Sequence, residues 1–322
     1  MILGAAGPLA FSLHPVSWMA VLLLAAAYAV VVRTRRSTVT RRQAWSFLGA
    51  MGLLVVALTW PVADLAAHWL LLALVVQRLI FMLAFPPLFL AGMPRSLVAR
   101  VTRPAPVDAV ARALTRPVPA VILVTVVAVG TLTVPAVDAQ ASSAVVRGGF
   151  DLLLLGAGVV LWSPVLHPLP GTERMSSLGQ AGYLVVQSIL PSFLSIVWIF
   201  ARHPLYPPYA HRHHVLGLSP VLDQQLSGFA AKLVTIFVLW AVAFVVVIRS
   251  ERLAESGQDP EPLTWADVER QLERLERRER RGMPSPSWRR TAGPGRRPHG
   301  PAAGGRPRRE GRREPGEGPG RT

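Results

Sequence analysis

The chain contains seven apolar runs of roughly 20 residues each, and this pattern constrains its fold more than any other feature. Hydrophobic residues make up 51% of the 322 residues. A helix needs about 20 apolar residues to cross roughly 30 Å of hydrocarbon. We therefore predict an all-α membrane protein, a bundle of seven transmembrane helices near residues 14–32, 44–60, 69–92, 117–137, 148–167, 178–201 and 226–248. Gly130 and Pro135 are expected to shorten or bend the fourth span.

The arginines predict the orientation of these spans. The formal net charge is +16, and five arginines lie within 33–43 and five within 93–116, whereas 61–68 has none and 138–147 has one. Short loops rich in Lys and Arg stay on the cytoplasmic side of a membrane. The pattern predicts a multi-pass protein of the inner or plasma membrane with its N-terminus outside and its C-terminus in the cytoplasm. The first residues lack the basic region of a secretory signal, so the first run is expected to be a retained span.

Composition divides the chain into three parts. Residues 1–250 form the expected transmembrane domain, and residues 251–281 a cytoplasmic linker with a short amphipathic helix that begins near Thr264. Residues 282–322 are rich in Arg, Pro and Gly, cannot build a core and are expected to be disordered. The simplest partner for this basic tail is anionic lipid of the bilayer. No nucleic acid is expected, because interleaved aromatic residues are nearly missing and acidic residues dilute the charge.

Histidines gather on the predicted outer face. Neutral imidazole is a ligand for copper or zinc, and the chain has no cysteine that could replace it. The candidate metal ligands are His14, His68, His203, His211, His213 and His214. The alternative is an ordinary solvated loop, because the spacing in 211–214 is not that of a fixed metal motif.

A second set of candidates consists of polar residues inside or beside the apolar runs. Such residues are costly in hydrocarbon and usually face the bundle interior. They are Gln77, Arg78, Asp151, Gln187 and Lys232 within the spans, and Asp223, Gln224 and Gln225 just before the last one. Arg78 is expected to pair with Asp151 or Asp223, and Asp223 to cap the helix that follows it. The set fits either a polar clamp between helices or a path for a small molecule or ion through Arg78, Asp151 and Lys232.

No arrangement of residues indicates catalysis. The glycine-rich segments lack the lysine and the strand–helix context of a phosphate-binding loop, and nothing places a nucleophile, base and orienting group together. The sequence predicts a protein that is not an enzyme.

Several short motifs together resemble the CtaG family of cytochrome c oxidase assembly proteins. The resemblance covers about residues 12–250 and is carried by His-Pro-x-x-Trp at 14–18, PPLFLAG at 86–92, LWSPVLHPLPGTERMS from 161, YLVVQSILPSFL from 183, LYPPY from 205 and GLSPVLDQQLSG from 217. It implies a seven-span protein that helps to mature the haem–copper oxidase, by copper delivery or by subunit maturation at the outer membrane face. Cytochrome c oxidase subunits are the implied partners, and Tyr206, Tyr209 and 223–225 would shape a docking surface.

One departure from the family pattern concerns the third span. The family shows H-M-x-Q-H there, whereas this chain keeps Gln77 but has Leu74 and Arg78 at the two histidine positions. Leucine cannot ligate a metal and a guanidinium repels a cation. Either copper binds elsewhere, for instance at the outer histidines, or this member is a metal-free scaffold for oxidase assembly. From another class, the carrier through Arg78, Asp151 and Lys232 remains the alternative.

Overall fold

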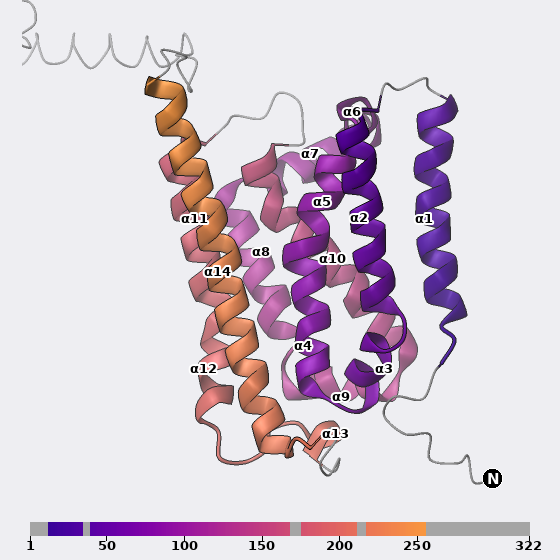
Figure 1. The fold of residues 1–322 in the computed structure, drawn as a ribbon, viewed down its shortest axis with the longest axis vertical. Coiled ribbons are helices and arrows are strands. Elements are labelled where there is room, and N and C mark those ends of the chain that lie inside the picture. The colour runs from indigo at the N-terminus through magenta and orange to yellow at the C-terminus, as the bar shows by residue number, and fades with distance from the viewer. Residues whose placement is uncertain (1–11, 35–38, 168–174, 211–216, 256–322) are drawn as a thin grey trace, which may run out of the picture. The chain divides into compact units, whose positions relative to one another are not determined.

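The transmembrane part is a bundle of helices (Figure 1), seen in a computed structural model that describes residues 12–34, 39–167, 175–210 and 217–255. Six helical segments are long and apolar enough to cross a membrane, or seven if a bent pair counts as one. Three of them are α1 (Pro15–Thr34), α10 (Ala144–Leu166) and α14 (Pro220–Glu255). The other three consist of consecutive helices: α2 (Arg41–Leu58) with α3 (Val62–His68); α4 (Leu71–Leu79) with the π-helix η1 (Ile80–Ala84) and α5 (Phe85–Gly92); and α11 (Ser177–Ile189) with η2 (Leu190–Ser192) and α12 (Phe193–Phe200). The prediction of an all-helical membrane protein is confirmed. The expected tail from residue 256 onward lies outside the described residues.

The fourth predicted span is shortened at Gly130, as the sequence indicated. α8 (Pro117–Gly130) has 14 residues, about 21 Å of helix, and is bent by 84° from α7 (Ala105–Leu114). The helix ends at Gly130, and Pro135 lies in the first turn of the next helix, α9 (Val134–Ser142). The predicted end of this span at residue 137 is therefore wrong. The chain turns between Gly130 and Pro135 instead of continuing the helix.

Short helices lie at both ends of the bundle (Figure 1). One end, which we call the α13 end, carries α3 (Val62–His68), α9 and α13 (Pro207–Ala210). The opposite end, the α7 end, carries α6 (Arg95–Val101) and α7.

The third span and α10 pack closely against each other at Gly158. A Cβ atom added at Gly158 would lie 2.6 Å from the carbonyl oxygen of Phe81 and 2.6 Å from Cγ of Pro86, so only glycine fits here. The indole of Trp162, one turn further on, donates to the carbonyl oxygen of Met82 at 3.0 Å. Because a π-helix leaves carbonyl groups without their usual partners, this bond helps to hold the distorted turn. These contacts fix the third span just after its buried polar residues Gln77 and Arg78.

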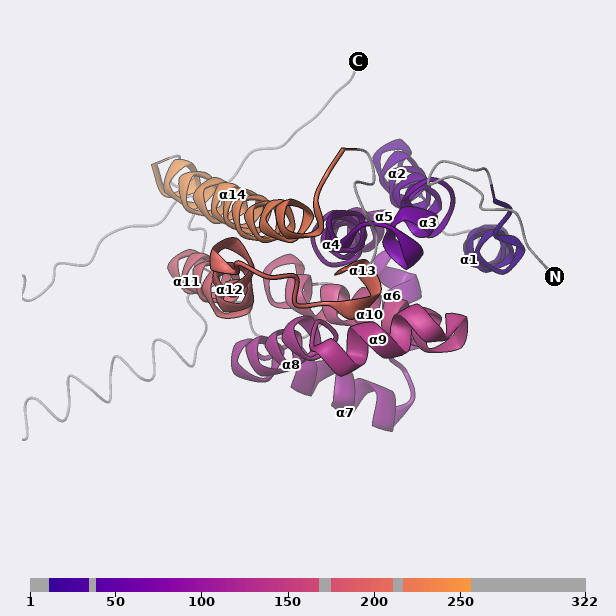
Figure 2. The ribbon, with the colours of Figure 1, turned by 90° about the horizontal axis from the view of Figure 1, so that it is seen from below.

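α1 lies at the periphery of the bundle and is the least buried of the candidate spans (Figure 2). Tyr28 stacks on Phe47 of α2 at a centroid distance of 3.7 Å and donates to the carbonyl oxygen of Gly92 at 3.1 Å. Most other α1 side chains are exposed, for example Leu22 and Leu23. In a membrane protein, exposed apolar side chains such as these two face lipid.

Candidate functional site

Arg78 is buried in the centre of the third span and is held by neutral hydrogen-bond acceptors. Its Nη1 donates to the hydroxyl of Thr131 at 2.6 Å, and its Nη2 donates to the carbonyl oxygen of Thr131 at 2.9 Å and to Oε1 of Gln140 at 2.8 Å. Thr131 lies in the turn after α8 and Gln140 in α9, so the broken fourth span supplies the acceptors. Gln140 is itself fixed, because its amide nitrogen donates to the carbonyl oxygens of Thr131 and Ala136 at 3.0 and 2.9 Å.

The predicted ion pair of Arg78 with a carboxylate is wrong. In the described part of the chain, Arg78 forms no ion pair with Asp151 or Asp223. Asp151 attracts Arg78 only through the electrostatic field and makes no hydrogen bond with it, and Asp223 binds elsewhere. Hydrogen bonds from a charged donor are stronger than neutral ones, so threonine and glutamine oxygens can hold the guanidinium without a counter-charge.

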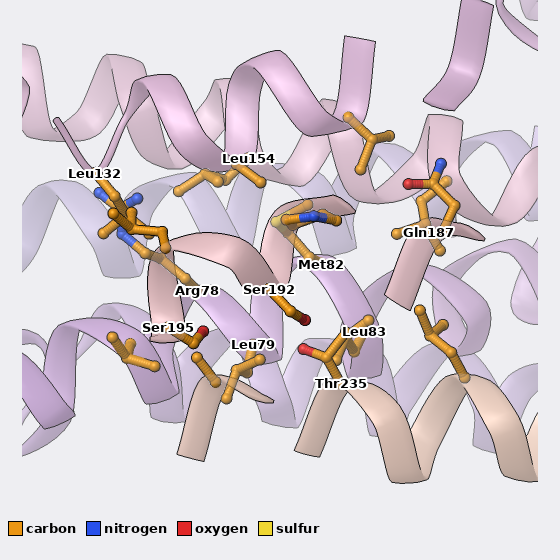
Figure 3. A pocket seen from close by; sticks show the side chains of 18 of the residues that line it. Arg78, Leu79, Met82, Leu83, Leu132, Leu154, Gln187, Ser192, Ser195 and Thr235 are labelled. Carbon is orange, nitrogen blue, oxygen red and sulfur yellow. The ribbon is translucent and has the colours of Figure 1, made fainter. Parts of the chain in front are cut away.

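A cavity of about 80 Å³ lies beside Arg78, between the third span, α8, α10, α11, α12 and α14. Figure 3 shows Arg78 at one end of it and Gln187 at the other, with Met82 between them and the hydroxyls of Ser192 and Thr235 on its wall. Two buried atoms here have no hydrogen-bond partner, Nε of Arg78 and Oε1 of Gln187. One is a donor and the other an acceptor, and the space suffices for several water molecules. The cavity therefore suits water or a small polar molecule, not a metal cation.

Apart from Gln187, the other candidates within the spans do not line this cavity. Gln77 donates from Nε2 to the carbonyl oxygen of Ala57 at 2.8 Å and so links the third span to α2. Neither Asp151 nor Lys232 lines the cavity, although Ala231 and Thr235 beside Lys232 do. Gln187 donates to the hydroxyl of Tyr183 at 3.0 Å, and Tyr183 donates to the carbonyl oxygen of Leu161 at 2.8 Å. Most of these polar groups therefore hold helices together.

Asp223 caps a helix, but not its own. Its two carboxylate oxygens accept from the backbone N–H groups of Leu71 and Leu72 at 2.7 and 3.0 Å, so it caps the start of α4. The cap of α14 itself is Ser219, whose hydroxyl accepts from the N–H of Leu222 at 3.3 Å. The expectation that Asp223 would cap the helix that follows it is thus corrected. Leu70 cannot supply this cap because its side chain has no acceptor.

The two glutamines after Asp223 fasten the segment between α12 and α13. Oε1 of Gln224 accepts from the N–H of Leu205 at 2.7 Å, and its Nε2 donates to the carbonyl oxygen of His203 at 3.4 Å. Gln225 donates to the carbonyl oxygen of Ala201 at 3.3 Å. The Asp-Gln-Gln sequence therefore organises backbone at the α13 end.

Two tyrosines complete this arrangement, which we call the α13 clamp: Tyr206, Tyr209 and residues 223–225. Tyr206 donates to the carbonyl oxygen of Leu132 and Tyr209 to that of Ala66, both at 2.6 Å. Burial raises the pKa of Tyr206 to about 12 and raises that of Tyr209 as well, so both phenols stay protonated and donate throughout the physiological range. Five candidate residues of the sequence thus form one hydrogen-bonded assembly.

The predicted metal ligands are not brought together among the residues that are described. His14 lies 3.2 Å from a carboxylate oxygen of Asp64, which also accepts from Ser12. His203 is exposed at the α13 end, and His211, His213 and His214 lie outside the described residues. In the described part, no group of three or more His, Asp or Glu side chains is placed to hold a metal ion. The outer histidine site stays a prediction.

Sequence reasoning missed Thr131 and Gln140. Their signal was weak: Thr131 is one polar residue within the predicted span 117–137, and Gln140 lies just after that span, where a loop was expected. Both are buried because α9 turns back against the bundle, and apolar periodicity does not reveal that turn.

Comparison with protein families gives one match. The family model "Cytochrome c oxidase caa3 assembly factor (Caa3_CtaG)" matches residues 26–252, well over half of the chain. Comparisons with curated proteins and with solved structures give no match. The matched range includes the third span, the cavity and the α13 clamp.

Proposed function

We propose that this chain, which belongs to the family of cytochrome c oxidase caa3 assembly factors, supports oxidase assembly as a non-catalytic membrane scaffold whose bundle interior carries no copper. The observation that carries the proposal is the set of three hydrogen bonds that hold the buried Arg78 on Thr131 and Gln140. A fixed positive charge at this depth repels a copper ion, and Leu74, one turn earlier, offers no ligand atom. The interior is therefore built to hold helices in place.

The α13 clamp is the part of the scaffold that would meet oxidase subunits. It joins α3, α4, α13 and α14 by hydrogen bonds from side chains to backbone, so the surface it supports is rigid. A preorganised surface binds a partner without an added cost of ordering. The arginine distribution supports an outward-facing α13 end, because Arg33, Arg100, Arg103, Arg112 and Arg116 belong to segments at or near the opposite end.

The carrier alternative has weaker support. A path through the membrane would need Arg78, Asp151 and Lys232 to share one cavity, and only Arg78 lines the cavity described above. The remaining walls are mainly apolar.

Copper delivery by the outer histidines is the second candidate function. His203 is exposed and belongs to the segment that the α13 clamp fastens, a short distance in sequence from His211, His213 and His214. Imidazoles there could present copper to an oxidase subunit at the same surface. Copper is cargo in this case, held outside the bundle.

A variant with all four of these histidines changed to alanine separates the two functions. In cells that lack the natural chain, we expect the four-alanine variant to restore oxidase activity to the level that the wild-type chain restores. The reason is that the α13 clamp uses the backbone of His203 and not its imidazole. The measurement is oxidase activity in membranes, with immunoblots to match chain levels. Loss of activity that added copper repairs would contradict the scaffold proposal and establish copper delivery, because excess metal fills weakened sites by mass action.

A further inference from the structure

An apolar groove of about 560 Å³ lies between α7 and the spans at the α7 end. Its walls are formed by Val107, Val110 and Leu114 of α7 and, opposite them, by Leu90 of α5 and by Val159 and Val160 of α10. This volume is within the range of roughly 300–1,000 Å³ that is typical of ligand pockets. Almost no polar atom reaches the groove, so its lining suits a hydrocarbon chain.

α7 stands away from the bundle that it faces. None of its residues is buried, and Val107 and Val110 are 42% and 58% exposed. Figure 2 shows α7 at the periphery of the bundle, and its 84° angle to α8 means that it does not continue that span. An amphipathic helix of this kind lies in the membrane interface with its apolar face toward acyl chains. Two apolar walls that face each other across a gap need an apolar group between them.

Positive charge flanks both ends of the α7 segment. Thr102 and Thr115 line the groove, and the next residue in each case is an exposed arginine, Arg103 or Arg116. Neither arginine forms an ion pair in the described part of the chain, whereas Arg112 is paired with Asp108 at 2.7 Å. An arginine beside an apolar groove at a membrane interface is a binding group for a phosphate ester.

We propose that this groove binds one anionic phospholipid, with an acyl chain between α7 and α10 and the negatively charged headgroup in the positive field of Arg103 and Arg116, which flank the two ends of α7. The lipid would act as a wedge that holds α7 at its distance from the bundle. The site is independent of the α13 clamp, which lies at the other end.

The test uses the full chain purified in detergent and native mass spectrometry with added phosphatidylglycerol or phosphatidylcholine of matched acyl chains. We expect the wild-type chain to retain phosphatidylglycerol more tightly than phosphatidylcholine. Changing both arginines, Arg103→Gln with Arg116→Gln, should weaken phosphatidylglycerol binding by roughly fivefold for each arginine. Phosphatidylcholine binding should stay unchanged. The matched control is Arg33→Gln with Arg249→Gln, which removes two exposed arginines near the same membrane face but away from the groove.

A second pair of variants tests the acyl-chain position. Ala111 lines the groove and Ala109 does not, so Ala111→Trp should displace lipid of either headgroup while Ala109→Trp retains it. Equal lipid retention by these two variants, or equal weakening by the two arginine pairs, would overturn the proposal. The proposal would also be overturned if the wild-type chain were a dimer that Ala111→Trp converts to a monomer without changing the amount of bound lipid. The groove would then be an interface between two copies of the chain. If Ala111→Trp does not give a folded protein, the arginine pairs decide.

Discussion

Replacing Asp223 by alanine is expected to lower the free energy of unfolding by about 3 kcal/mol, because the buried start of α4 loses its cap. The substitution leaves the N–H groups of Leu71 and Leu72 without acceptors, and the first of these is buried. Water cannot replace the carboxylate easily where the side chain is 3% exposed. Unfolding of the purified chain in mixed micelles measures the change.

Two control variants make this expectation specific. Asp223→Asn keeps one carbonyl oxygen and should lose less than the alanine variant. Ser219→Ala removes the cap of α14, which is exposed, and should cost about 1 kcal/mol or less. If Asp223→Ala were no worse than Ser219→Ala, the carboxylate would not hold α4, and the α13 clamp would lose its central element.

The second large effect is expected at Gln140, the side-chain acceptor for Arg78. Gln140→Leu should lower the free energy of unfolding by about 3 kcal/mol, because it takes an acceptor away from a buried charged donor. In an Arg78→Leu background the same substitution should cost about 1 kcal/mol or less, since no charge remains to be left unpaired. The double-mutant cycle, measured by unfolding in mixed micelles, gives the coupling between the two residues.

Asp151→Asn in the same two backgrounds is the matched control for that cycle. Asp151 makes no hydrogen bond with Arg78, so its coupling to Arg78 should be clearly smaller than that of Gln140. A larger coupling for Asp151 would show that the carboxylate, and not the glutamine, compensates the guanidinium.

The helical bundle could be predicted from the sequence because apolar length alone decides whether a segment can span a bilayer. Six of the seven runs are helices that pass this test. The fourth run could not be delimited in the same way. Its end depends on the local turn at Gly130 to Thr133. Apolar residues lie on both sides of this turn, so the hydropathy of the sequence does not show where the helix ends.

The polar contacts were harder to predict, since they join residues far apart in the chain. A buried arginine suggests a carboxylate partner, and the sequence offered Asp151 and Asp223. The observed partners are 53 and 62 residues away and uncharged. Asp223 was recognised as a capping residue, but the helix that it caps begins 152 residues earlier. Only the packing of α4 beside α14 reveals that pairing.

Tyr206, Tyr209 and the two glutamines were selected for their place in motifs, without a structural role for each. Their hydrogen bonds now give each a structural role. The two tyrosines attach α13 and the residue before it to α3 and to the turn after α8, and the two glutamines attach α14 to the segment before α13. The resemblance to family motifs identified these residues because the motifs contain specific polar residues. The periodicity of apolar residues carries no information about such polar positions.

The central claim is that the chain supports oxidase assembly as a scaffold and not by supplying copper from its interior. The most direct measurement is cytochrome c oxidase activity in membranes of cells that lack the chain, grown with and without added copper. The scaffold account predicts low activity in both cultures and full activity only when the wild-type chain is restored. Recovery of full activity by copper alone, without the chain, would contradict it.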